Sequence, residues 1–416
     1  MGVFMNIGFI STWFERGAAY VTRYYLNSVK ENNNVFVYAR GGENYAKGNL
    51  KWDKNYVTWA PRLNGTEINW NHFKKWIKQN NIDILFFNEQ QSFEIVLKCK
   101  YYLPKIKIGS YIDYYKQDTV DIFKYFDFLI CNTKRHFEVF DWHEQCYYIP
   151  WGTDIEKFTP DNTNKKYINK LELDNDKITF SHSCGMSLRK GTDILLDTFI
   201  DNKKIYNNSN LIIHSQLNFK ETYGYSVNEL KKYNIHIIEE TVSHPGLYFL
   251  GDVYVYPTTL DGLGLTMYEA LAVGLPVITT DEPPMNEVVN NEIGYLVDVE
   301  KKISRYDAYY WPLSFCSQDS LKESLVYYID NKESLLDLKK QARKYAVENF
   351  NLMKNLETIE DIFYNTKIIN YDKNNVKKVL KNQKYQKKKK ALKSVFDEFI
   401  PDFIRSTIYN YKFNNN

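Results

Sequence analysis

The chain has 416 residues, 44% of them hydrophobic, and a net charge of +3. This length favours two or three domains with ordinary cores, and so small a net charge argues against a nucleic-acid-binding protein. The five cysteines are scattered and the seven histidines form no paired ligand motif, which indicates a reducing compartment and no metal site.

The first half of the chain alternates predicted strands and helices, as in an open α/β sheet. Strands are expected over residues 3–10, 35–39, 82–87, 107–112 and 128–131, and helices over 18–30 and 71–79. Polar residues follow these strands, where open α/β sheets bind ligands, and Asp113 is one of them. Gly17 lies just before the first helix and allows close approach to its N-terminus. Each also has a structural interpretation, Gly17 as a turn glycine and Asp113 as a helix cap.

A polar stretch rich in Asn and Lys, residues 161–173, predicts a boundary before a second α/β region. The first strand of that region, 178–182, leads into a loop that contains Arg189, Lys190 and Gly191, and a helix is expected over 193–199. Two adjacent cations can hold a diphosphate through charge-assisted hydrogen bonds, or they can form a solvated pair. The Asp174-Asn175-Asp176 triplet precedes a strand and indicates a turn.

The most informative stretch is residues 252–280, DVYVYPTTLDGLGLTMYEALAVGLPVITT. A β-rich run ends at Pro257, the loop Asp261-Gly262-Leu263-Gly264 follows, and a helical segment runs from Leu265 until Gly274 ends it. A strand, glycine loop and helix in this order seat phosphates on the helix N-terminus. The carboxylates of Asp261 and Glu269 can flank one extended ligand. In the structural alternative, Asp261 caps the helix and Glu269 faces solvent.

This stretch resembles the EX7E region of retaining glycosyltransferases of family 4, which reads roughly E-G-F-G-L-x-x-x-E-A-x-A-x-G-x-P-V-I. The chain follows that pattern from Asp261 to Ile278, and aspartate in place of the first glutamate is the clear departure. Residues 147–160 and 178–199 also resemble family motifs, although Gly185 stands about where the family has an arginine. The resemblance covers about residues 1–365.

The resemblance implies an α/β fold of GT-B architecture, with two Rossmann-like, doubly wound domains facing each other across a cleft. Residues 1–160 are expected to form the acceptor-side domain and 161–350 the nucleotide-sugar-binding domain. Residues 351–369 are expected to form a helix that crosses back to the first domain, and 370–416 a helical, basic tail. The implied activity is transfer of a sugar, with retention and without a metal, from a nucleotide-diphosphate sugar to a hydroxyl of a glycan, lipid-linked sugar or glycoprotein. The nucleotide sugar is then a substrate, and no cofactor is expected.

The resemblance also assigns roles to individual residues. Asp261 is expected to contact the transferred sugar and Glu269 the ribose of the donor. Lys190 is expected to hold the donor diphosphate, with Arg189 in place of the missing family arginine. Further donor contacts are expected from Gly17, Gly262, Leu263, Gly264 and Leu265. Asp113 lies near the position of a histidine that family members often carry close to the reacting sugar.

The tail falls outside the resemblance. It contains the basic run Lys387-Lys388-Lys389-Lys390, followed by apolar residues at helical spacing, so residues 384–400 can bind an anionic membrane surface. The same stripe can instead pack on the protein, with the lysines in solvent. No apolar run approaches the ~20 residues of a membrane helix, and a cytoplasmic location with at most peripheral membrane contact is expected.

Two other functions stay open from the sequence. An inverting transferase would share the fold and differ in the anomer of its product. A catalytically inactive protein that binds sugar nucleotides or acts as a scaffold is favoured by the replacements at Asp261, Gly185 and Asp113. The retention of Lys190 and Glu269 argues against it.

Overall fold

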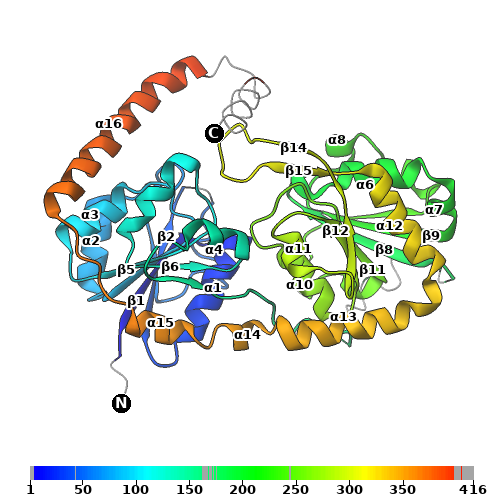
Figure 1. The fold of residues 1–416 in the computed structure, drawn as a ribbon, viewed down its shortest axis with the longest axis horizontal. Helices are drawn as coiled ribbons and strands as arrows, with labels where there is room; N and C mark the ends of the chain where they lie inside the picture. Colours follow the sequence, from blue (N-terminus) through cyan, green and yellow to red (C-terminus); the bar gives the residue numbers. More distant parts are fainter. Residues whose placement is uncertain are drawn as a thin grey trace. The chain divides into compact units, whose positions relative to one another are not determined.

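The computed structural model describes residues 4–42, 44–161, 167, 171, 173–174, 176–242, 245–397 and 404, and it describes no side chains between 386 and 397. These residues divide into two compact units, and many of their helices and strands are labelled in Figure 1. The first unit comprises residues 1–150, 304–311 and 356–416, and the second comprises 151–303 and 312–355. The chain therefore passes between the units more often than the expected continuous ranges, 1–160 and 161–350, imply.

The first unit is built on a parallel sheet with strand order β3-β2-β1-β4-β5-β6-β7. The strands are β1 (Asn6–Thr12), β2 (Asn34–Arg40), β3 (Val57–Trp59), β4 (Ile84–Phe87), β5 (Lys107–Tyr111), β6 (Phe128–Cys131) and β7 (Cys146–Tyr148). The helices are α1 (Gly17–Val29), α2 (Trp70–Gln79), α3 (Glu94–Tyr102), η1 (Gln117–Tyr125), α4 (Lys134–Phe140), α15 (Ile359–Asn365) and α16 (Lys373–Asp397). Every residue of β4 is buried, as expected for a parallel strand covered on both faces.

The second unit has a parallel sheet with strand order β10-β9-β8-β11-β12-β13 and a separate antiparallel hairpin, β14-β15. The strands are β8 (Ile178–Gly185), β9 (Ser209–Ser215), β10 (Ile235–Glu239), β11 (Val253–Tyr256), β12 (Val277–Thr280), β13 (Gly294–Val297), β14 (Val299–Ile303) and β15 (Leu313–Cys316). The helices before β12 are η2 (Leu188–Lys190), α6 (Thr192–Ile200), α7 (Lys203–Asn208), α8 (Phe219–Tyr223), α9 (Val227–Lys231), η3 (Tyr248–Leu250) and α10 (Leu265–Ala272). Those after it are α11 (Met285–Val288), α12 (Gln318–Asp330), η4 (Lys332–Ser334), α13 (Leu335–Asn349) and α14 (Leu352–Asn355).

Both parallel sheets confirm the predicted doubly wound arrangement. In each, the chain winds outward in one direction and then in the other, so the order reverses between β1 and β4 and again between β8 and β11. Open α/β sheets bind ligands at the carboxyl ends of the strands beside such a reversal. In the second unit, the loops that follow β8 and β11 contain Lys190 and Asp261.

Residues 304–311 join β14 to β15 but pack with the first unit. The Tyr310 N–H donates to the Tyr115 carbonyl at 3.0 Å, and the Trp311 indole N–H donates to the Tyr115 hydroxyl at 2.7 Å. The Tyr309 hydroxyl donates to the carbonyl of Asp113 at 3.0 Å. These contacts explain why a segment expected within the 161–350 domain belongs to the first unit.

The segment expected to be one helix over 351–369 contains two, α14 and α15. Asn351 forms a bridge with Thr153, in which the Thr153 N–H donates to the Phe350 carbonyl and the Leu352 N–H donates to the Thr153 carbonyl. Asn351 is thus held in a bridge and lies outside the helix, and α14 begins at the next residue, Leu352. The helical segment 359–365 lies in the first unit.

The basic tail is helical, as predicted, from Lys373 to Asp397. Its first part contacts α3, with Val376 and Leu380 buried in the core of the first unit. The apolar stripe expected over 384–400 falls mostly outside the described side chains, and residues 398–400 fall outside the described residues. Among the helices described, none has both the length and the apolar composition needed to cross a membrane.

Candidate active site

Lys190 is held by a short turn between β8 and α6. Gly191 ends this turn with a φ of +72°, and a Cβ atom on it would lie 2.0 Å from the carbonyl oxygen of Pro257, just after β11. The carbonyl oxygen of Arg189 accepts hydrogen bonds from the Thr259 N–H at 2.8 Å and from the Thr258 hydroxyl at 2.9 Å. Only glycine at position 191 allows the turn to lie this close to Pro257. The Lys190 turn is thereby joined to the end of β11.

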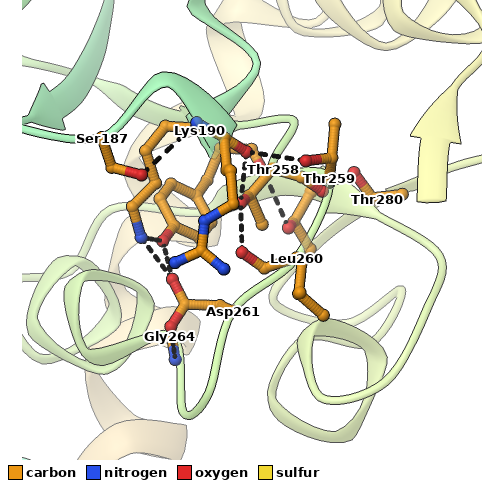
Figure 2. Close-up of polar contacts among 11 residues, drawn as sticks. Ser187, Lys190, Thr258, Thr259, Leu260, Asp261, Gly264 and Thr280 are labelled. Atoms are coloured by element: carbon orange, nitrogen blue, oxygen red, sulfur yellow. Dashed lines mark hydrogen bonds and ion pairs between the residues drawn. The ribbon is translucent and has the colours of Figure 1, made fainter. Parts of the chain in front are cut away.

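The carboxylate of Asp261 is the centre of a polar cluster (Figure 2). It forms an ion pair with the Lys190 ammonium group and accepts a hydrogen bond from the Tyr256 hydroxyl, which in turn accepts one from Lys190. The backbone N–H of Gly264 also donates to Asp261, at 3.1 Å. Burial alone would raise the pKa of Asp261, but Lys190, Tyr256 and Gly264 hold it well below its usual range.

The structure bears out the helix-cap interpretation of Asp261, and its contact with a sugar stays a prediction. Asp261 accepts from the backbone at the start of α10, as a cap does, and it also faces Lys190 across the loop. The Lys190 and Asp261 side chains are 20% and 17% exposed, so a ligand can reach both. The ammonium group has three N–H donors, of which these contacts use two.

The N-terminus of α10 directly follows Asp261. Gly264 is its N-cap residue and has a left-handed backbone with φ of +70°. A Cβ atom added to Gly264 would lie 2.3 Å from the terminal methyl carbon of Met267. Leu263 is buried, whereas Gly262 and Leu265 are half-buried. The first amides of a helix point out of its N-terminus and attract anions.

Glu269 lies in the second turn of α10 and borders a cavity of about 130 Å³. The Tyr248 hydroxyl donates to its carboxylate at 2.6 Å. Burial raises the pKa of Glu269 to about 7, although the hydrogen bond from Tyr248 and the charge of Lys157 act in the opposite direction. Glu269 is thus half-buried, lines a cavity and bonds to Tyr248, so the structure does not support the alternative of a freely solvated side chain. The cavity is also lined by Ser181, His182, Ser183, Ile212, His214, Val242, Gly246, Leu247, Tyr254 and Thr266.

The remaining candidate residues are Arg189, Gly17 and Asp113. The Arg189 side chain is exposed, and its backbone fixes the Lys190 turn. Gly17 is the first residue of α1, and Asp113 lies two residues after the end of β5, so both lie in the first unit. The structure thus pairs Lys190 with Asp261, and it places Glu269 in α10, the helix that follows the Asp261 loop.

Sequence reasoning missed four side chains of this site, namely Tyr248, Tyr256, Ser183 and His214. A signal existed for three of them, because Tyr256 is the last residue of β11 and Ser183 and His214 lie near the carboxyl ends of β8 and β9. Their contacts depend on neighbouring strands, which the sequence pattern does not identify.

The expected turn at Asp174 is present, because the Asp174 carboxylate accepts from the Asp176 N–H at 3.1 Å, while Asn175 lies outside the described residues. Within the part of the chain that the structure describes, no three His, Cys, Asp or Glu side chains are grouped as metal ligands.

Part of the chain matches a known family model. Residues 163–308 match the family model "Glycosyl transferases group 1", a range that contains Arg189, Lys190, Asp261 and Glu269. The chain is 25% identical over 222 residues to the UDP-Gal:alpha-D-GlcNAc-diphosphoundecaprenol alpha-1,3-galactosyltransferase of Escherichia coli, which covers 52% of this chain and 53% of that protein. Across the curated relatives it matches, the chain spans between 35% and 57% of their length.

Solved structures resemble the chain over most of its length. A glycosyltransferase from Rickettsia africae superposes with a TM-score of 0.65 at 18% identity. The matched region covers 87% of this chain and 99% of the Rickettsia chain. HepE from Anabaena, in complex with UDP and glucose, superposes with a TM-score of 0.64 at 15% identity. The matched region covers 87% of this chain and 100% of the HepE chain. Together with the two doubly wound sheets, these likenesses show that the chain has the GT-B fold of glycosyltransferases.

Proposed function

We propose that this protein is a glycosyltransferase that moves a sugar from a nucleotide-diphosphate sugar to a hydroxyl acceptor, with retention of the anomeric configuration. One observation carries the proposal. Helix α10 has the Lys190–Asp261 pair at its N-terminus and Glu269 in a cavity one to two turns further on. A positive helix end, a cation and a half-buried carboxylate in this order suit the diphosphate and the sugar hydroxyls of such a donor.

The donor diphosphate is assigned to the N-terminus of α10. The amides of Gly262, Leu263 and Leu265 supply N–H donors, and the ammonium group of Lys190 supplies a charge-assisted hydrogen bond. The exposed guanidinium of Arg189 can add a second cation from the same turn. The ribose is assigned to the cavity, where the Glu269 carboxylate can accept hydrogen bonds from its hydroxyls.

The chemical step breaks the bond between the anomeric carbon of the sugar and an oxygen of the diphosphate. It forms a bond from that carbon to the acceptor oxygen, whose proton passes to the leaving diphosphate. The leaving diphosphate gains negative charge as its bond to the sugar breaks. Lys190 and the helix N-terminus are already fixed at that position, so they stabilise the transition state without reorganisation. In this scheme positive charge comes from the protein and no metal is required, so we expect chelation with EDTA to leave the rate unchanged.

Asp261 is proposed to contact the transferred sugar. Aspartate is one methylene shorter than glutamate, and in this protein Lys190, Tyr256 and the Gly264 amide fix the position of its carboxylate. The first unit is proposed to bind the acceptor, with Gly17 and Asp113 at the carboxyl edge of its sheet.

The test is release of nucleotide from UDP-, GDP-, ADP-, TDP- and CDP-sugars by the full chain. We expect slow hydrolysis of one donor class, abolished in Glu269→Ala and in Lys190→Ala. Lys204→Ala is the matched control, because Lys204 forms an exposed ion pair with Asp330 and does not line the cavity. No turnover and no thermal shift with any nucleotide would refute the proposal.

Two alternatives have their own readouts. Binding of a nucleotide without turnover in the presence of a panel of sugar acceptors would favour an inactive, sugar-nucleotide-binding protein. Once an acceptor is found, NMR analysis of the product anomer separates retention from inversion.

Peripheral contact of α16 with an anionic membrane is a second part of the proposal. The helix is rich in lysine, its acidic residues are limited to Asp397, and Lys377, Lys378, Lys381 and Lys384 are exposed. The E. coli relative is named for a diphosphoundecaprenol substrate, which is lipid-linked. We expect co-sedimentation with phosphatidylglycerol vesicles at low salt, lost when Lys387 to Lys390 are all changed to Gln. Equal binding to phosphatidylcholine vesicles would refute an electrostatic contact.

A further inference from the structure

Ser183 and His214 line the same cavity as Glu269 and form a hydrogen-bonded pair. Ser183 lies near the end of β8 and His214 near the end of β9, and the two residues are register partners in the parallel sheet. The Ser183 hydroxyl and the His214 Nδ1 atom are 2.9 Å apart. On its other side, the His214 Nε2 atom lies 2.9 Å from the carbonyl oxygen of Glu240, which follows β10.

The direction of these hydrogen bonds follows from elementary chemistry. A carbonyl oxygen can only accept, so His214 must carry a proton on Nε2. Burial lowers the pKa of His214, more strongly than the Glu240 carbonyl and carboxylate raise it, so the ring is neutral near pH 7. Its Nδ1 atom is then an acceptor, and the Ser183 hydroxyl donates its proton to it. The Ser183 oxygen therefore offers a ligand in the cavity acceptor lone pairs and no proton.

We propose that Ser183, oriented by His214, selects the base of the donor nucleotide by accepting a hydrogen bond from a ring N–H. This inference rests on the proposed function, which places the nucleoside in this cavity beside Glu269. Uracil, thymine and guanine carry a protonated ring nitrogen on the edge that pairs with other bases. Cytosine and adenine have a lone pair on the corresponding nitrogen, which would face the Ser183 lone pairs without a proton between them. Ser183 is thus a specificity-determining residue, and His214 is a positioning residue.

The location agrees with the fold. The relay from Ser183 through His214 to Glu240 runs across the carboxyl ends of β8, β9 and β10, where doubly wound sheets bind nucleotides. The Ser183 proton is held by His214, and the His214 proton is held by the Glu240 carbonyl. The Ser183 hydroxyl can therefore donate to the lone pair of cytosine or adenine only if it gives up its bond to His214. A site that loses a buried hydrogen bond in this way discriminates strongly against the wrong ligand.

The test measures equilibrium binding of UDP, CDP and the diphosphate of N3-methyluridine to the full chain by titration calorimetry. UDP and CDP have nearly the same shape and differ in the protonation of N3, and the methyl group removes the N3 proton from uracil. We expect UDP to bind roughly tenfold to hundredfold more tightly than either of the other two. GDP and ADP give the matching purine comparison.

Two variants identify the residues responsible. Ser183→Ala removes the acceptor and is expected to bring the ratio of UDP to CDP affinity close to one. His214→Leu keeps the hydroxyl but frees its proton, so CDP binding is expected to rise while UDP binding changes little. Ser324→Ala is the control, because Ser324 is a buried serine of the second unit that bonds within its own helix, to the Leu321 carbonyl.

The possible outcomes separate this inference from the proposed function. If UDP and CDP bind equally tightly, or if Ser183→Ala leaves their ratio unchanged, the base-selection role of Ser183 is wrong and the transferase proposal stands. If no nucleoside diphosphate binds, the proposed function fails, and this inference fails with it.

Discussion

Glu269 is a residue whose proposed role conflicts with stability. The carboxylate borders a cavity, and burial raises its pKa to about 7 from an ordinary value of 4.5. The ionised carboxylate is the stronger acceptor for ribose hydroxyls, but its surroundings disfavour that form. Conflicts of this kind are typical of binding sites, where function limits stability.

This conflict predicts a pH-dependent stability difference between the wild type and Glu269→Gln. Between pH 4.5 and 7 the unfolded chain releases the Glu269 proton while the folded chain keeps it, so the free energy of unfolding falls as pH rises through that window. Glutamine stays neutral and can still accept from Tyr248. We expect Glu269→Gln to be more stable than the wild type by about 1–3 kcal/mol at pH 8, and equally stable at pH 4.

Calorimetric unfolding at the two pH values tests this prediction. Glu221→Gln, an exposed position on α8, serves as the control and should change stability at neither pH. A loss of stability at pH 8 in Glu269→Gln would show that the carboxylate is stabilised in the folded protein. The same variant should bind the donor nucleotide more weakly, because a neutral amide is a poorer acceptor for hydroxyls.

Tyr256→Phe tests whether the cluster around Asp261 is positioned for catalysis. Burial raises the pKa of the Tyr256 hydroxyl well above its usual range, so it remains a donor to Asp261 and an acceptor from Lys190. Without the hydroxyl, Lys190 and Asp261 each lose their hydrogen bond to Tyr256. We expect kcat to fall on the order of tenfold, with a smaller change in the KM for the donor.

Tyr328→Phe is the matched control for Tyr256→Phe, since Tyr328 is a buried tyrosine of α12 in the same unit. An equal loss of kcat in both variants would indicate a general effect on folding, and an unchanged kcat in Tyr256→Phe would exclude a positioning role.

At this scale, the sequence pointed to the charged residues of the proposed site but not to their partners. Lys190, Asp261 and Glu269 belong to recognisable motifs, whereas Tyr248 reaches Glu269 across 21 positions of sequence. The backbone conformation gives one reason why this chain has Gly185 where the family has an arginine. Residue 185 has a φ of +53°, which strongly favours glycine. No local pattern reveals a φ value that neighbouring strands impose.

The element that positions Lys190 is the turn ending at Gly191, and it gives a prediction with an internal control. Gly191 and Gly224 both have left-handed backbones, with φ of +72° and +83°. A Cβ atom at Gly191 would lie 2.0 Å from the Pro257 carbonyl oxygen, whereas at Gly224 nothing lies within 4 Å. We expect Gly224→Ala to cost about 1 kcal/mol for its φ alone, and Gly191→Ala to cost about 3 kcal/mol or more.

Urea unfolding measures both costs, and nucleotide release from the donor measures the displacement of Lys190. Activity should fall in Gly191→Ala and stay normal in Gly224→Ala. Equal stability losses would mean that the contact with Pro257 relaxes without cost.

The elements themselves were largely predictable. Buried runs such as 128–131 and 107–112 coincide with β6 and with β5 to within one residue, because their apolar stretches are bounded by polar and turn residues. The hairpin β14-β15 was not predicted, since Val299–Ile303 carries charged residues in an exposed, two-stranded sheet and lacks the apolar pattern of a core strand. The docking of 304–311 depends on Tyr115 and Asp113, almost 200 residues earlier.

At the scale of the whole molecule, the last segment of the chain is tied to the first unit by a buried ion pair. Lys100 and Asp127 are 4% and 0% exposed, with 2.5 Å between Nζ and Oδ1. The Asp127 carboxylate also accepts from the Ile108 N–H at 2.8 Å in β5, and from the Ile369 N–H at 2.7 Å just before α16. One carboxylate therefore joins α3, β5 and the segment that leads into the tail.

Asp127→Ala is expected to destabilise the first unit by about 3–5 kcal/mol, because it leaves the Lys100 ammonium group buried without its partner. The two units have separate apolar cores, so we expect the loss to stay in the first one. Hydrogen exchange should accelerate in β5 and α16 and remain unchanged in β11 and α10, with nucleotide affinity preserved. Asp337→Ala, which breaks an exposed pair with Lys340, should change none of these. Faster exchange in β11 as well would mean that the two units unfold as one, and that the tail contributes to the stability of the nucleotide site.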